Sequence, residues 1–102
     1  MKIEMNPNEM VIKANDSSQV LNGSSIKGKL ILTNQRLYFK ASDNGKRHND
    51  VEIMPDDIKE VMLFNNRILF STGLNIVTDD GIENKFLVKN RNDWSEMIVR
   101  MC

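Results

Sequence analysis

Two apolar runs on either side of a short polar break constrain the fold more than any other feature of the chain. The stretch KGKLILTNQRLYF, residues 27–39, puts Asn34 and Gln35 between the runs, and asparagine tolerates the positive φ that a two-residue hairpin turn needs. A turn there gives the facing pairs Thr33–Arg36, Leu32–Leu37, Ile31–Tyr38, Leu30–Phe39 and Lys29–Lys40. Because side chains alternate along a strand, one face then holds Leu30, Leu32, Leu37 and Phe39. A one-residue slip would divide them between both faces, so the pattern fixes the register.

The rest of the chain alternates short apolar runs with closely spaced turn signals, which is typical of an all-β sandwich or barrel. The turn signals are Asn22-Gly23, Asn34-Gln35, Asn44-Gly45, Asn65-Asn66 and Asp80-Gly81. A short strand with Val51 and Ile53 pointing inward should end at Pro55, since proline cannot donate to a strand ladder. The next strand is expected in DDIKEVMLF, residues 56–64.

The last hairpin is expected between GLNIVT, residues 73–78, and KFLV, residues 85–88. A three-residue loop with Gly81 in the left-handed region puts Leu74 opposite Phe86. The segment RILF, residues 67–70, allows two interpretations. Either the chain turns tightly at Asn65-Asn66 and the segment is a mostly buried strand, or a long loop exposes its apolar residues to a membrane or a partner.

The C-terminal residues change period. Apolar side chains recur at i, i+3, i+4 and i+7 in Trp94, Met97, Ile98 and Met101, which predicts an amphipathic helix over about residues 91–101. Asn90 or Asn92 could cap its start. The apolar stripe must be buried, and the open end of the sandwich is where we expect it.

Length and composition favour a single cytoplasmic domain over residues 1–102, with a loosely ordered start over about residues 1–8. The formal net charge is zero, so no overall field attracts nucleic acid, and electrostatic binding requires a local patch. Cys102 is the single cysteine, which excludes an intramolecular disulfide and fits a reducing compartment. No signal peptide and no apolar run of about 18 residues is visible in the sequence.

The residue types needed for catalysis or metal binding are scarce. A nucleophile needs a base beside it, and the single histidine, His48, lies in a polar loop far along the chain from Cys102. The Cys and His ligands of a zinc site are missing, and no glycine-rich phosphate cradle precedes a helix. We therefore expect a protein that is not an enzyme and has no cofactor and no metal.

The sequence resembles the GRAM domain, a member of the pleckstrin-homology-like (PH-like) superfamily, at three places. GKLILTNQRLYF (28–39) is similar to the signature hairpin, DDIKEV (56–61) to the following strand, and GLNIVTDDGIENKFLVKNRNDWSEMI (73–98) to the final hairpin and helix. The resemblance covers roughly residues 9–101. It implies a mainly β fold, a bent sandwich or barrel of about seven antiparallel strands capped by the C-terminal helix. It also implies a module that binds membrane lipids or protein partners, although only Lys27 and Lys29 stand where phosphoinositide-binding members carry several basic residues.

The outward face of the first hairpin is the candidate ligand or partner surface. It comprises Lys27, Lys29, Arg36, Tyr38 and Lys40. Like charges directly opposite each other destabilise a sheet, so either an anionic ligand bridges Lys29 and Lys40, or Glu52 on the next strand neutralises Lys40. Two functions follow: contacts with a protein partner or a second copy of the chain, or, alternatively, peripheral binding to anionic membrane lipid.

Overall fold

The computed structural model describes residues 4–21, 24–42, 50–66 and 71–101. The elements are β1 (Val11–Leu21), β2 (Ser24–Thr33), β3 (Leu37–Ala41), β4 (Val51–Ile53), the short 3₁₀ helix η2 (Pro55–Asp57), β5 (Ile58–Asn66), β6 (Ser71–Thr78), β7 (Glu83–Leu87) and α1 (Arg91–Met101). The predicted mainly β fold with a C-terminal helix is therefore confirmed. No helix in these ranges is both long and apolar enough to span a membrane.

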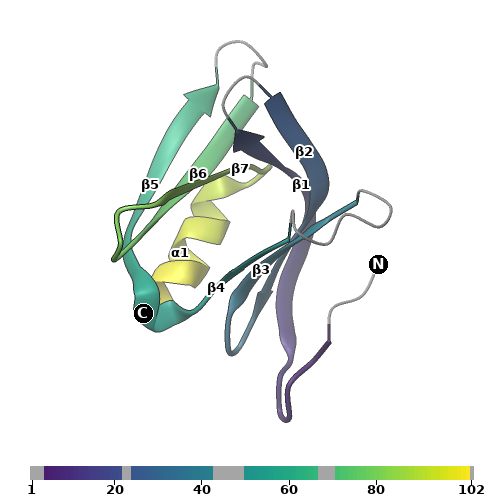
Figure 1. The fold of residues 1–102 in the computed structure, drawn as a ribbon. Helices are drawn as coiled ribbons and strands as arrows, with labels where there is room; N and C mark the ends of the chain where they lie inside the picture. The colour runs from purple at the N-terminus through teal and green to yellow at the C-terminus, as the bar shows by residue number, and fades with distance from the viewer. Residues whose placement is uncertain (1–3, 22–23, 43–49, 67–70, 102) are drawn as a thin grey trace.

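All seven strands form one sheet in the order β4-β3-β2-β1-β7-β6-β5, and every neighbouring pair is antiparallel. β1 pairs with β2 along its length but with β7 only over Ser18–Val20, so this short ladder joins the two halves of the sheet. The sheet bends strongly, and α1 packs against β5 and β6 (Figure 1).

The register of the β2–β3 hairpin is the predicted one. Leu30 lies opposite Phe39, Ile31 opposite Tyr38 and Lys29 opposite Lys40, and the Thr33 N–H donates to the Arg36 carbonyl to close the turn. The predicted inward residues Leu30, Leu32, Leu37 and Phe39 are at most 2% exposed. The Phe39 and Phe86 rings lie with their centroids 5.4 Å apart, which ties this hairpin to the other half of the sheet.

The second half of the sheet agrees with the sequence pattern except at the two ends of β5. Leu74 lies opposite Phe86, and Gly81 has a φ of +85°, both as predicted. β5 begins only at Ile58, because Pro55 starts the 3₁₀ turn η2 that contains the two preceding aspartates. The alternative of a turn at Asn65-Asn66 is wrong, because both residues pair with β6. Residues 67–70 lie outside the described residues.

Helix α1 buries the stripe that its sequence predicts. Trp94 and Ile98 are fully buried, and Met97 and Met101 pack against the same core. The Trp94 Nε1–H donates to Asn15 Oδ1 of β1 at 3.0 Å. Asn90 precedes the helix and its carbonyl accepts the Trp94 N–H, whereas Asn92 lies inside the helix and does not cap it.

The N-terminal segment is clamped to the β2–β3 turn by a buried ion pair. Glu9 Oε2 accepts from Arg36 Nε at 2.8 Å and from Thr33 Oγ1 at 2.6 Å, while its Oε1 accepts from Arg36 Nη2 at 3.1 Å. Asn34 and Gln35 side chains donate to the carbonyls of Asn8 and Pro7. Within residues 1–8, for which the sequence predicts a loosely ordered start, hydrogen bonds are made by Glu4, Asn6, Pro7 and Asn8.

Replacing Glu9 by glutamine should lower the free energy of unfolding by about 2–3 kcal/mol, because the buried guanidinium of Arg36 loses its charged partner. Urea unfolding monitored by Trp94 fluorescence measures the change. The matched control is Glu4→Gln, since the Glu4 side chain is exposed and its contribution to Arg36 is a backbone carbonyl. Equal stability of the two variants would contradict the clamp.

The same ion pair predicts a pH dependence. The Arg36 hydrogen bonds, opposed by burial, lower the pKa of Glu9 from 4.5 to about 2. Because the folded pKa is the lower one, the stabilisation is complete above about pH 4.5 and is lost as the pH falls toward 2. Urea titrations across this range should show a steeper loss of stability for the native chain than for Glu9→Gln; parallel curves would exclude the effect.

Candidate functional site

The two facing lysines of the hairpin are flanked by acids on both sides. Lys29 lies opposite Asp16 of β1, and the Lys40 ammonium is 2.9 Å from Asp50 Oδ2. The predicted pairing of Lys40 with Glu52 is wrong, because the β3–β4 register puts Glu52 opposite Tyr38. The charges across the strands therefore run acid, base, base, acid, which relieves the repulsion between the lysines without a ligand.

Arg36 serves the fold and is buried away from any ligand. Its guanidinium donates to Glu9, to Glu52 and to the backbone carbonyl of Glu4. These contacts, with the Glu9 bond the strongest, raise the pKa of Arg36 above its already high value although burial opposes them. The sequence suggested an exposed cation at the turn, whereas the structure gives Arg36 a structural role.

Tyr38 and Lys40 belong to a second internal network centred on Asp50. The Tyr38 hydroxyl donates to Asp50 Oδ2 at 3.1 Å, and the Ala41 N–H donates to Asp50 Oδ1 at 2.9 Å. Burial, and then the hydrogen bond to Asp50, raise the pKa of Tyr38. Burial tends to raise the pKa of Asp50, but the bonds from Lys40, Ala41 and Tyr38 together lower it. Of the five candidate residues, only Lys27 and Lys29 remain available to a ligand.

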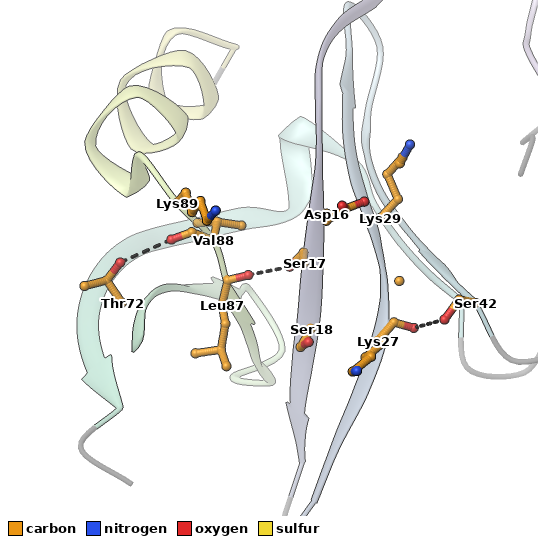
Figure 2. A pocket seen from close by; sticks show the side chains of 11 residues that line it. Asp16, Ser17, Ser18, Lys27, Lys29, Ser42, Thr72, Leu87, Val88 and Lys89 are labelled. Atoms are coloured by element: carbon orange, nitrogen blue, oxygen red, sulfur yellow. Dashed lines mark hydrogen bonds between the residues drawn. The ribbon is translucent and has the colours of Figure 1, made fainter. Parts of the chain in front are cut away.

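These two lysines line an open groove of about 690 Å³ between β1, β2 and the end of β7. Figure 2 shows Lys27 and Lys29 on one wall and Lys89, which follows β7, on the other. The lining residues are Asp16, Ser17, Ser18, Lys27, Gly28, Lys29, Ser42, Thr72, Leu87, Val88 and Lys89. We call this feature the lysine groove.

The lysine groove exists because β1 and β7 separate. Their pairing ends at Ser18–Leu87, and beyond it the chain leaves β7 toward α1. The Ser17 hydroxyl donates to the Leu87 carbonyl at 2.8 Å, and the Thr72 hydroxyl donates to the Val88 carbonyl at 3.2 Å (Figure 2). Ser42 Oγ donates to the Lys27 carbonyl at 2.9 Å on the other side. These bonds fix the backbone of the two walls from which the lysines extend.

The groove lysines differ from Arg36 and Lys40 in having no ionic partner among the described residues. Within the described ranges, the ammonium groups of Lys27, Lys29 and Lys89 make no hydrogen bond or ion pair. Hydroxyl groups of the groove stand beside them. Ammonium groups without a partner among the described residues suit a phosphate or carboxylate.

Sequence reasoning missed Lys89. It follows the last strand, and nothing in the linear pattern connects it with Lys27 or Lys29, which lie about 60 residues earlier. Only the β1–β7 ladder brings them to one hollow.

A second hollow in the described chain has the opposite charge. This hollow, of about 400 Å³, lies between β4, η2 and the β6–β7 turn, and its charged residues are Glu52, Asp57, Asp79 and Asp80. Among the residues described, no group of three or more His, Cys, Asp or Glu side chains could hold a metal ion.

Comparison with solved structures identifies the fold. A C-terminal domain of an unknown protein from Leishmania infantum superposes with a TM-score of 0.76 and 13% identity, covering 93% of this chain and 86% of that one. The Vps36 N-terminal PH domain superposes with a TM-score of 0.73 and 18% identity, covering 96% of this chain and 82% of that one. No family model matches the sequence, and no curated protein matches it. The chain therefore has a PH-like fold.

Proposed function

We propose that the domain is a non-enzymatic, cytoplasmic binding module that attaches peripherally to anionic membranes by holding a lipid phosphate in the lysine groove. The observation that carries this proposal is the set of three lysines without ionic partners among the described residues. The PH-like fold and the resemblance of the sequence to GRAM domains support a binding role, and GRAM membership is part of the proposal.

The strength of such binding follows from the charges. Each lysine near an anionic membrane contributes about 1 kcal/mol, so three give weak attachment that salt screens. The net charge is zero, so attraction depends on the orientation of the groove toward the membrane.

The double variant Lys27→Gln/Lys29→Gln should lose most co-sedimentation with vesicles containing phosphatidylinositol phosphate at low salt, by about ten-fold or more. The control Lys59→Gln/Arg100→Gln removes the same charge from exposed positions outside the groove and should bind like the native chain. Raising the salt concentration should release the native protein. Equal losses in both variants, or no binding to anionic vesicles at low salt, would refute the proposal.

A second candidate function is self-association through an exposed apolar surface where the N-terminal segment enters β1. It comprises Met5, Met10, Val11 and Ile12, of which Met10 is 68% exposed. Patches of this kind commonly mark contacts, and the zero net charge leaves no overall repulsion between two copies. The sheet edges are weaker candidates. β4 has three residues, and β5 is irregular between Ile58 and Glu60, with its Phe64 carbonyl bound by Arg91.

Sizing chromatography over a concentration series tests self-association. We expect the native chain to elute earlier as its concentration rises, and Met10→Glu to abolish that shift because a charge would be buried in the interface. Val99→Glu is the control, since Val99 is similarly exposed on α1 outside this surface. A single monomer peak at every concentration excludes self-association. Contact with a different protein is then the form of protein interaction that is left.

A further inference from the structure

We infer that Asp16 makes the lysine groove selective for phosphate groups that carry a neighbouring ammonium or hydroxyl donor, over phosphates without one. The inference rests on the proposed binding of an anion in this groove, and it defines the chemical class of that ligand. The same chemistry could belong to a lipid headgroup or to a free phosphate compound.

The two acids that flank the lysine pair have different surroundings. Asp50, beside Lys40, accepts hydrogen bonds from Lys40, Tyr38 and the Ala41 N–H, so its carboxylate is occupied. Asp16, beside Lys29, is exposed and makes no hydrogen bond or ion pair with any residue that the structure describes. Asp50 thus holds Lys40 directly, whereas Asp16 eases the repulsion on Lys29 only through space and keeps a carboxylate that no described residue binds.

That carboxylate lines the groove itself. Asp16 and Lys29 are cross-strand partners, and Figure 2 shows their side chains close together at one end of the groove, with Ser18 and Lys27 at the next level. A ligand whose phosphate contacts the lysines therefore also meets Asp16. Besides moderating the repulsion between Lys29 and Lys40, an acid in this position repels every anion that offers it no hydrogen-bond donor.

The chemistry of a carboxylate determines which ligands gain from it. An ionised carboxylate only accepts hydrogen bonds, so it repels the oxygens of a bare phosphate. A ligand with an ammonium or hydroxyl group next to its phosphate can give a hydrogen bond to Asp16 while the phosphate contacts Lys27 or Lys29. The groove thus matches a ligand with an anionic part and a donor part.

The test compares two soluble ligands with the same two-carbon chain, ethyl phosphate and O-phosphoethanolamine, which differ by one ammonium group. Binding is followed by shifts of the groove backbone amides in NMR titrations. The native chain should prefer O-phosphoethanolamine by about two- to five-fold, the range expected for an exposed ion pair. In Asp16→Asn the preference should reverse, because the ammonium then only lowers the negative charge that the lysines attract. Asp56→Asn, an exposed acid outside the groove, is the control and should keep the native preference.

Each outcome is informative. A native chain that binds both ligands equally, or an Asp16→Asn variant that keeps the native preference, overturns the role of Asp16 and leaves anion binding in place. A native chain that binds neither ligand overturns the proposed function as well. A parallel measurement with vesicles containing phosphatidylinositol 4-phosphate or phosphatidic acid identifies the source. Selectivity on vesicles assigns the ligand to lipid headgroups, and selectivity confined to the soluble pair assigns it to free phosphate compounds.

Discussion

The register of the β2–β3 hairpin is the constraint on which the rest of the structure depends. It sends four large apolar side chains of the hairpin into the core, where Phe39 meets Phe86 of β7 and joins the two halves of the sheet. The same register turns every other residue outward, so that Lys27 and Lys29 can only lie on the solvent side of β2. The positions of the core residues and of the groove lysines thus follow from the same alternation of side chains. A one-residue shift in register would displace both sets.

A second constraint acts at the turn of this hairpin. Arg36, directly after the two turn residues, carries a buried guanidinium, and burying a charge is costly unless it is paired. The chain provides Glu9 from the N-terminal segment and Glu52 from β4, which lie on either side of Arg36 in sequence. The clamp therefore links three segments around the turn and stabilises the register that the apolar residues select.

Local pattern predicted most of the fold. The alternation at Leu30 and Leu32, the glycine at position 81 and the helical spacing from Trp94 to Met101 each act within a few residues, and the structure agrees at each. The errors concern pairings over longer distances. The sequence order suggests Glu52 as the partner of Lys40, whereas Asp50 takes that place, because the β3–β4 register depends on the loop between these strands. The proximity of Lys89 to Lys27 depends on the β1–β7 ladder, which no local pattern encodes.

The distinction between paired and unpaired cations separates the candidate site from the scaffold. The hairpin alone suggested a continuous basic face, yet Arg36 and Lys40 are bound by carboxylates of neighbouring segments. Lys27 and Lys29 have an exposed aspartate in their groove, and it forms an ion pair with neither of them in the described chain. An ammonium already bound to a carboxylate must lose that partner before it can hold a phosphate. A lysine without a partner in the described chain avoids that loss, so it binds a phosphate with a more favourable free energy. A chain of zero net charge can therefore keep two lysines of this hairpin available at its groove, because carboxylates of neighbouring segments already hold Arg36 and Lys40.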